Sequence, residues 1–386
     1  MSPDDGCNRL AGDPWRLNHR LATWVRRIAL VIGLALAVVF LIRFRYAAWD
    51  FRNNLWGPAR LLLQGDMPYN PQALKGLASE WGVPFHLSIW FPTILGIGFP
   101  LALLPLPQAA NVWLLFSLLA AFATAVLVHR ISGPEVSLQG LLPLTLIVTL
   151  FAPLYAHLGQ GQASLIVLVS LFAGWVLLEQ NRPAWAGLVL SVSWVKPQLI
   201  LLAWPALVWL AIEKGRLRPA LVGWLAGSLA QTISLWILEP TWASGYLSAL
   251  SANQSWLQPN IHSLVAYWSG DEVLGWLVAL LGLVVGASWL VYAWRRGERM
   301  IVFSWALALT PMLSPYTWSY DQVLLLPLMV VAIRRAKRGP RRTVFWIVFL
   351  SCQAVYMTLR VQGANDAWYA WYPAILMLLG VWLTYP

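Results

Sequence analysis

Long apolar runs recur along the whole chain and are separated by short polar segments. A run of about 20 apolar residues is long enough to cross about 30 Å of hydrocarbon as a helix. The pattern predicts an all-α polytopic membrane protein with about 12 transmembrane helices in one domain, residues 28–386, behind a cytoplasmic tail, residues 1–27. The expected spans are 27–44, 110–129, 139–157, 163–179, 184–196, 198–213, 217–237, 273–293, 300–314, 320–333, 343–361 and 368–385.

The segment Phe85–Pro107 is apolar enough to span but is interrupted by prolines and glycines. If it dips into the membrane without crossing and the N-terminus is inside, 19 of the 26 Lys and Arg residues lie on the cytoplasmic side, as the positive-inside rule favours. A crossing with the N-terminus outside gives the same count, and a helical hairpin over 85–129 also stays open. The basic pair directly before the first span favours the first option. Loops 45–87 and 238–272 are then extracytoplasmic.

Composition supports a membrane location and excludes other classes. Only 11% of the residues are charged, whereas a soluble protein carries about 25%. The net charge of +11 therefore indicates cytoplasmic loops and contact with lipid headgroups, not nucleic acid. The two cysteines, Cys7 in the tail and Cys352 in an apolar run, predict neither a disulfide nor a cysteine metal site. The tail lacks signal-peptide features, so we expect the first helix to remain as an anchor in a bacterial plasma membrane.

Asp50 is the first candidate for chemistry. It follows the first span and opens a helical pattern with Phe51, Leu55, Ala59 and Leu62 on one face. That amphipathic pattern is typical of a helix in the membrane interface, with Arg52 and Asn53 among its polar faces. A partly desolvated carboxylate there has a raised pKa and suits a general base. The alternative is an ordinary solvated loop aspartate.

Two cations are candidates for binding a phosphate. Lys196 lies between two apolar runs and is followed by Pro197, which breaks the helix. A lysine so close to membrane segments is costly and therefore a functional candidate. Arg360 lies near the outer end of its span and is a second candidate phosphate partner. For both, the alternative is a side chain that reaches to the membrane surface.

The other polar residues expected on the outer face vary in type, whereas the inner face carries mostly Lys and Arg. Amides, hydroxyls and aromatic rings suit sugar binding, although any exposed loop needs polar residues. The sequence shows no metal-ligand spacing, and we expect no metal or other cofactor. The candidate substrate-binding residues are Asp66, Tyr69, His86, Gln160, Gln162, Asn253, Gln254, Ser314, Trp318, Tyr320 and Asp321.

An ordered set of short motifs covers most of the chain. It comprises Asp50-Phe51, Gly65-Asp66-Met67-Pro68-Tyr69, Gly159-Gln160 with Ala163-Ser164, Lys196-Pro197, Asn253-Gln254-Ser255 and Ser314-Pro315-Tyr316-Thr317-Trp318. The set resembles glycosyltransferase family 87, polytopic enzymes of the GT-C fold that include mannosyltransferases using polyprenyl-phosphate-linked mannose. The sequence departs from the pattern at two places: Ser319, Tyr320 and Asp321 stand where some members of the family carry histidines, and Ile89-Trp90-Phe91-Pro92 stands where the family often reads Tyr-Pro-Pro.

The resemblance implies a reaction on the extracytoplasmic face. A hexose, mannose by analogy, would pass from a polyprenyl-phosphate sugar to a hydroxyl of a lipid- or glycan-linked acceptor, with inversion at the anomeric carbon. Asp50 would be the catalytic base, and the Lys196 and Ser314–Trp318 regions would line the donor pocket. The competing hypothesis is a polytopic transporter or lipid flippase, which more often shows repeat symmetry and mid-span charges.

Overall fold

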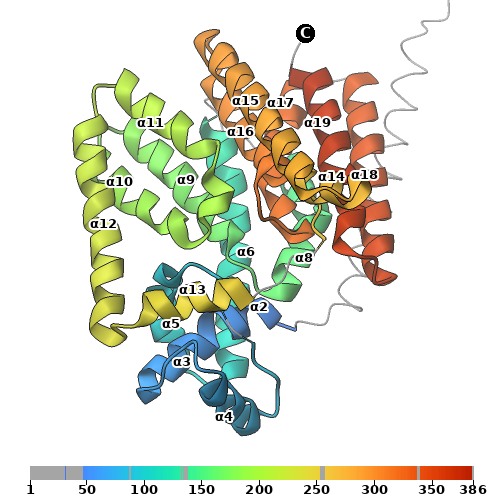
Figure 1. Cartoon of the computed structure of the whole chain (residues 1–386). Helices are drawn as coiled ribbons and strands as arrows, with labels where there is room; N and C mark the ends of the chain where they lie inside the picture. The colour runs from blue at the N-terminus through green and yellow to red at the C-terminus, as the bar shows by residue number, and fades with distance from the viewer. Residues whose placement is uncertain are drawn as a thin grey trace, which may run out of the picture.

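The protein is all-helical in a computed structural model, which describes residues 31, 47–86, 88–131, 133, 138–252, 257–336 and 340–384 (Figure 1). No β-strand occurs among these residues. The all-α prediction is therefore confirmed for the described chain. The expected first span, 27–44, the tail with Cys7, and Asn253 and Gln254 lie outside the described residues.

Helices occupy each of the other expected ranges. The bundle comprises α6 (Leu106–Ile131), α7 (Leu138–Leu150), α8 (Ala152–Gln160), α9 (Ser164–Glu179), α10 (Pro183–Ser191), α11 (Ala203–Glu213), α12 (Leu217–Leu238), α14 (Ile261–Ser269), α15 (Glu272–Arg295), α16 (Arg299–Leu313), α17 (Leu326–Arg335), α18 (Pro340–Val361) and α19 (Trp371–Thr384). Short 3₁₀ segments join some of them: η3 (Val192–Val195), η4 (Pro197–Ile200), η5 (Ser319–Leu325) and η6 (Asp366–Tyr369).

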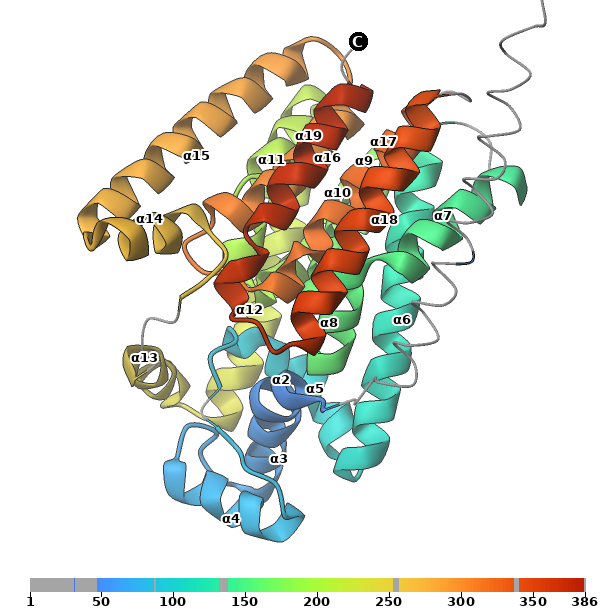
Figure 2. The same cartoon turned by 90° about the vertical axis from the view of Figure 1, so that its right-hand side faces the viewer.

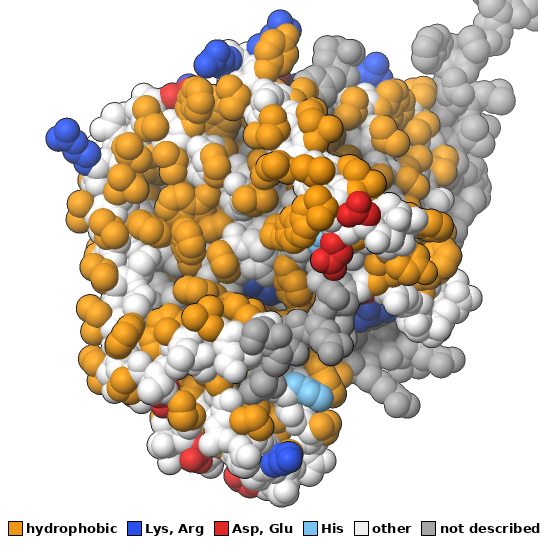
Figure 3. All heavy atoms as spheres, viewed as in Figure 1, with side chains coloured by type: hydrophobic (Ala, Val, Ile, Leu, Met, Phe, Trp, Pro, Cys, Tyr) orange, Lys and Arg blue, Asp and Glu red, His pale blue; other side chains and the backbone are white. Residues whose placement is uncertain are grey.

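Several expected spans are broken into shorter helices. By length and composition, five helices in the described part are able to cross a membrane, or six if α8 and α9, bent by 115° at their junction, form one broken span. Four further apolar helices are shorter. Figure 3 shows hydrophobic side chains covering most of one face of the molecule, as lipid contact requires. The protein is thus an integral membrane protein, and the number of 12 crossings stays a prediction.

Shorter helices gather at the lower end of the bundle (Figures 1 and 2). They are α2 (Trp49–Phe51), the π-helix η1 (Arg52–Trp56), α3 (Gly57–Gln64), α4 (Pro71–Trp81), η2 (Pro92–Ile94), α5 (Leu95–Ala102) and α13 (Trp242–Ala252). Within the ambiguous segment, 85–107, residues 92–102 form η2 and α5, and α6 begins at Leu106. Together the 11 residues of η2 and α5 extend about 16–18 Å, which is short of the hydrocarbon thickness of about 30 Å.

The helix that carries Asp50 is more enclosed than its amphipathic pattern suggests. Phe51, Leu55 and Ala59 are buried as expected. Arg52 and Asn53, which the pattern placed on polar faces, are also buried, so that part of the prediction is wrong. The reason is that protein groups meet both: the Asn53 Oδ1 accepts a hydrogen bond from the His86 backbone N–H at 3.0 Å, and the Arg52 guanidinium lies over the Trp49 and Phe85 rings. A location in the interface plane stays a prediction.

Candidate active site

Two cavities meet beside Asp50. The smaller has a volume of about 170 Å³ and lies against Trp90, Phe91, Lys196, Tyr246 and Leu250. The larger, about 840 Å³, lies between α2, α4, α13 and the start of η5, and reaches Arg360 and Asp366. Both are lined by Asp50, Ile89, Tyr316 and Tyr320. A carboxylate at this junction is able to contact two molecules at once, one in each cavity.

Two side-chain amides hold the Asp50 carboxylate. The Asn54 Nδ2 donates to Oδ1 at 3.2 Å, and the Gln162 Nε2 donates to Oδ2. The amide oxygens face donors on the other side: the Asn54 Oδ1 accepts from the Ile89 backbone N–H at 2.9 Å, and the Gln162 Oε1 accepts from Lys196 Nζ at 2.6 Å. Because these donors cannot accept hydrogen bonds, both amides must turn their NH₂ groups to Asp50. The surroundings therefore favour a carboxylate that accepts hydrogen bonds.

A glycine places Gln162 in front of Asp50. Helix α8 ends at Gly161, which has a φ of 72°, a left-handed conformation that costs glycine little. A Cβ on Gly161 would lie 2.6 Å from the Phe51 Cβ, so only glycine allows this close approach of α2. The Ala48 N–H donates to the Gly159 carbonyl at 3.2 Å and ties the two segments together. Gln162 follows directly at the bend between α8 and α9.

Pro197 places Lys196. A residue before proline is disfavoured in the helical region, and Lys196 indeed has φ −137° and ψ 77° between η3 and η4. The side chain is buried and its ammonium lies 5.5 Å from the Trp90 ring centroid and 5.2 Å from that of Tyr320. Besides Gln162, it donates to Ser164 Oγ at 3.1 Å and to Asp321 Oδ1 at 2.8 Å.

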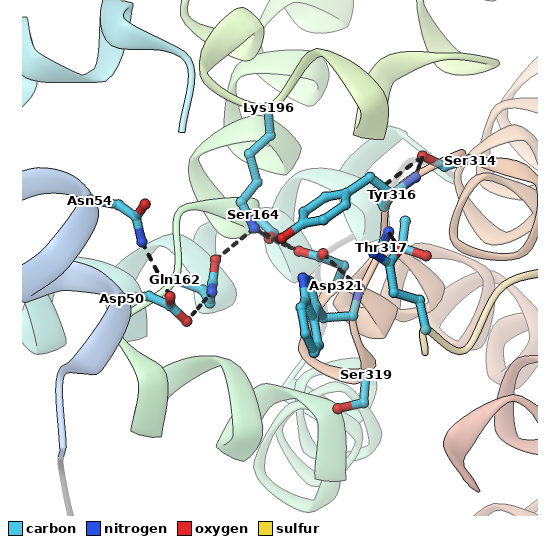
Figure 4. A network of polar contacts seen from close by, with 12 residues as sticks. Asp50, Asn54, Gln162, Ser164, Lys196, Ser314, Tyr316, Thr317, Ser319 and Asp321 are labelled. Carbon is cyan, nitrogen blue, oxygen red and sulfur yellow. Dashed lines mark hydrogen bonds and ion pairs between the residues drawn. The ribbon is translucent and has the colours of Figure 1, made fainter. Parts of the chain in front are cut away.

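Asp321 closes this network from the far side (Figure 4). It is fully buried, its Oδ1 also accepts from the Ser164 hydroxyl, and its Oδ2 accepts from the Trp318 backbone N–H at 3.1 Å. The last bond caps the start of η5. A continuous chain of hydrogen bonds thus runs from Asp50 through Gln162 and Lys196 to Asp321. Asp321 lines neither of the two cavities.

The electrostatics of Asp50 suit a base. Asp50 lies outside the five candidate membrane spans. Burial raises its pKa to about 6, while the charge of Lys196 and the Gln162 hydrogen bond act in the opposite direction. A carboxyl group with a pKa near the working pH is ionised at neutral pH yet basic enough to accept a proton from a hydroxyl.

A second carboxylate borders the larger cavity and was not among the candidates. Asp366 accepts hydrogen bonds from the Ser319 backbone N–H at 2.7 Å and from its hydroxyl at 2.6 Å, and lies 4.0 Å from the Arg360 guanidinium. No sequence motif marks Asp366. Asn54 was also missed, although its place one turn after Asp50 on the expected helix was a usable signal.

The other sequence candidates separate into two groups. His86, Gln160, Trp318 and Tyr320 line the larger cavity together with Asp50 and Arg360. Tyr69 is buried against Tyr246 and Gly245, Asp66 is exposed at the turn between α3 and α4, and Ser314 is buried with its hydroxyl 3.4 Å from the Tyr316 carbonyl. Within the described ranges, no group of three or more His, Cys, Asp or Glu side chains is placed to hold a metal ion.

The described chain is thus an all-helical membrane protein with a carboxylate held between two cavities. The chain belongs to glycosyltransferase family 87, whose model matches residues 92–315, more than half of its length. It is therefore a membrane glycosyltransferase. The matched range contains Gln162 and Lys196 but ends before Asp321 and begins after Asp50. No curated protein and no solved structure matches the chain.

Proposed function

We propose that the protein transfers a hexose from a polyprenyl-phosphate sugar to a hydroxyl of a lipid- or glycan-linked acceptor. The hexose is mannose, and the reaction takes place on the extracytoplasmic side of a bacterial plasma membrane. Asp50 is the general base, and the anomeric carbon is inverted. The observation that carries this proposal is the location of Asp50, held by two amide donors at the junction of two cavities. The family supports the transfer reaction.

The reaction is a single displacement. The acceptor hydroxyl oxygen attacks the anomeric carbon, the bond from that carbon to the phosphate oxygen breaks, and the hydroxyl proton passes to the Asp50 carboxylate. The polyprenyl phosphate leaves with the bonding electron pair and needs no proton. Attack opposite the leaving group inverts the anomeric carbon, and one base suffices, in contrast to the paired carboxylates of glycoside hydrolases.

Two cations stabilise the leaving phosphate in this scheme. Arg360 lines the larger cavity, and both Arg360 and Lys196 are close enough to Asp50 to oppose the rise of its pKa. Lys196 contributes through its charge, because its hydrogen bonds are directed to protein groups. Lys196 is fixed before the reaction by its three hydrogen bonds, so little reorganisation of its charge is needed as negative charge develops on the phosphate oxygen.

The cavity walls suit the two kinds of substrate group. Trp90, Phe91, Val195 and Leu250 give the smaller cavity an apolar side that fits isoprenoid units. The stacked rings of Trp318 and Tyr320, 6.1 Å apart, and the Trp49–His86 pair, 4.9 Å apart, offer faces for a sugar ring in the larger cavity. His86, Gln160 and Asp366 add polar groups for sugar hydroxyls there.

The test is a transfer assay on the full chain in lipid nanodiscs. Polyprenyl-phosphate mannose, glucose and galactose, each radiolabelled, are incubated with a lipid extract of a bacterial envelope as acceptor. We expect labelled mannose in the lipid or glycan fraction, and its loss in Asp50→Asn. Glu80→Gln, which changes an exposed acid on α4 in the same segment, is the matched control and retains transfer.

Each outcome has a separate meaning. Transfer of glucose or galactose but not mannose would replace the proposed sugar. Transfer that survives in a folded Asp50→Asn variant would remove Asp50 as the base. Retention of the anomeric configuration, read by NMR of the product, would contradict the single displacement.

A further inference from the structure

The hydrogen-bond chain behind Asp50 contains an ion pair, Lys196–Asp321, that is hydrogen-bonded to Asp50 only through Gln162. We propose that Lys196 and Asp321 are positioning residues for the base: Asp321 anchors Lys196, Lys196 fixes the orientation of the Gln162 amide, and Gln162 holds the Asp50 carboxylate as an ionised acceptor facing the cavities. This inference rests on the proposed function of Asp50. It gives Lys196 a role beyond stabilising a phosphate.

The first observation is that the Lys196 ammonium has used all of its donors. It has three N–H bonds and three acceptors within hydrogen-bond distance, at Gln162 Oε1, Ser164 Oγ and Asp321 Oδ1. A phosphate oxygen that took a hydrogen bond from Lys196 would displace one of these buried groups. Leaving such a group unsatisfied is costly, so the hydrogen bonds of Lys196 serve the protein.

The second observation is the direction of the Gln162 amide. Without a donor at its oxygen, the amide is free to rotate by half a turn and to present that oxygen to Asp50, where it would repel the carboxylate. Lys196 prevents this rotation because an ammonium group is a donor only. The Ile89 backbone N–H does the same for Asn54 on the other side of Asp50. The two oxygens of the base are thus held from both sides by amides of fixed direction.

The third observation is the anchor. Asp321 is fully buried and accepts three hydrogen bonds, from Lys196, Ser164 and the Trp318 backbone N–H. A carboxylate so placed has no route to a substrate in either cavity. Its charge balances that of Lys196 and keeps the ammonium group in the one position from which it reaches Gln162.

Other charges also face Asp50. The titratable and charged groups that interact with it are Lys196, Asp321, Arg360 and Tyr320, while His157 faces Lys196 and the Gln162 backbone, and Arg52 lies over the Trp49 ring. Of these, Lys196 opposes the rise of the Asp50 pKa most strongly, and Asp321 adds to that rise to a smaller degree. Loss of Lys196 therefore moves the titration of Asp50 to higher pH, even if Asp321 is neutralised as well.

The test measures the titration of Asp50 without turnover. The carboxylate band of ¹³C-labelled aspartate is followed by infrared spectroscopy against pH in nanodiscs, with Asp50→Asn to identify the Asp50 component. We expect the midpoint to rise by at least half a pH unit in Lys196→Met and in the charge-balanced Lys196→Met/Asp321→Asn variant. The second variant avoids an unpaired buried charge. Lys214→Met, which breaks an ion pair of another lysine, leaves the midpoint unchanged.

Kinetics on the same variants separate positioning from binding of the donor phosphate, and Gln162→Leu, which keeps the Lys196 charge, separates positioning from stabilisation of the leaving phosphate. We expect kcat to fall at least tenfold in Lys196→Met/Asp321→Asn and in Gln162→Leu, with the donor KM changed less than threefold. In the variant that combines Gln162→Leu with the charge-balanced pair, we expect kcat to fall by less than the product of the two separate fold-decreases. The reason is that all three residues act through one hydrogen bond.

The proposal is overturned if the charge-balanced variant leaves both the Asp50 midpoint and kcat unchanged and raises only the donor KM, as a phosphate ligand would. It is also overturned if the effects of Gln162→Leu and the charge-balanced pair multiply independently. A wild-type protein without transfer activity, or an active Asp50→Asn variant, would defeat the proposed function instead. The infrared midpoints would still report whether Lys196 acts on Asp50.

Discussion

Two lysine ion pairs in this protein have almost the same length and very different surroundings. Lys196 lies 2.8 Å from Asp321 with side chains 4% and 0% exposed. Lys214 lies 2.7 Å from Glu179 with side chains 22% and 43% exposed. The first pair is enclosed beside the two cavities, and the second joins the end of α9 to the turn after α11. Distance alone therefore does not distinguish a pair that supports a site from a pair on the surface.

The difference lies in what must happen if a pair is broken. Water replaces the lost partner of an exposed charge, so exposed pairs contribute about 0–1 kcal/mol. A buried charge that loses its partner stays uncompensated, which costs about 3–5 kcal/mol. The buried pair is tolerated because every lysine proton and both Asp321 oxygens have protein partners. The buried pair is hydrogen-bonded to Asp50 through Gln162, so breaking it also disturbs Asp50. Within the described chain, the exposed pair, Lys214–Glu179, is not hydrogen-bonded to Asp50.

The largest expected effect is at the carboxylate that the buried pair supports. Asp50→Asn should lower kcat by about 10²–10⁴-fold, the contribution of a positioned general base. The loss is increased because both Asp50 oxygens accept hydrogen bonds from amide NH₂ groups. The NH₂ group of an asparagine would face one of these donors without forming a hydrogen bond. Single-turnover transfer in nanodiscs measures it. A fall of less than tenfold would show that the enclosed network serves something other than catalysis.

The next effect compares the two lysines directly. Lys196→Met should destabilise the fold by about 3–5 kcal/mol, because Asp321 stays buried without its cation. Adding Asp321→Asn should recover much of that loss. Thermal unfolding followed by tryptophan fluorescence, with the same nanodisc composition throughout, gives the ranking. An equal effect of Lys196→Met and Lys214→Met would remove the distinction between the pairs.

The pH dependence of transfer gives a smaller effect. With a pKa of about 6, Asp50 is largely ionised at pH 8 and about one-tenth ionised at pH 5, so kcat/KM should fall about tenfold on acidification. The sign follows from the base, which acts in its deprotonated form. The same raised pKa affects stability. Because the folded protein holds the Asp50 proton more tightly than the unfolded chain does, the contribution of Asp50 to the free energy of unfolding falls as pH rises through about 6. A rate that rises on acidification would contradict its role as base.

The smallest effect is expected at the exposed pair. Lys214→Met should change stability by less than about 1 kcal/mol and leave kcat and KM unchanged. Raising the salt concentration to 1 M shortens the screening length to about 3 Å and should erase even that difference, while leaving the Lys196 effect in place. Unfolding temperatures at low and high salt are the measurement. A salt-sensitive Lys196 effect would mean that the inner pair is reached by water.

The sequence predicted the helices well because apolar runs of membrane length leave few alternatives to a helix. It also predicted the chain break at Lys196, since Pro197 limits the backbone of the preceding residue. It placed Asp50 on a helix, but not the burial of Arg52 and Asn53, which depends on backbone and rings from 85–86. A helical pattern reports one face of one segment and says nothing of a neighbour that covers the other face.

The site was predictable only as separate residues. Asp50, Gln162, Lys196 and Asp321 were each candidates, but their order in one hydrogen-bond chain was not. That order depends on Gly161, whose missing side chain lets Phe51 approach, and no local pattern reveals such a contact. Asp366 was missed for the same reason, because its partner Ser319 lies 47 residues away and belongs to another element.

The separation of the site residues along the chain has a consequence for biogenesis. Asp50 emerges from the ribosome early, but Gln162 comes 112 residues later, and Asp321 comes 125 residues after Lys196. Until the segment with Asp321 has been inserted and has docked, the lysine has no anchor and the amide has no fixed direction. A nascent or truncated chain therefore carries Asp50 but not the hydrogen-bond network that holds its carboxylate. On the proposed function, transfer therefore requires a chain assembled through η6, which also brings Arg360 and Asp366 to the larger cavity.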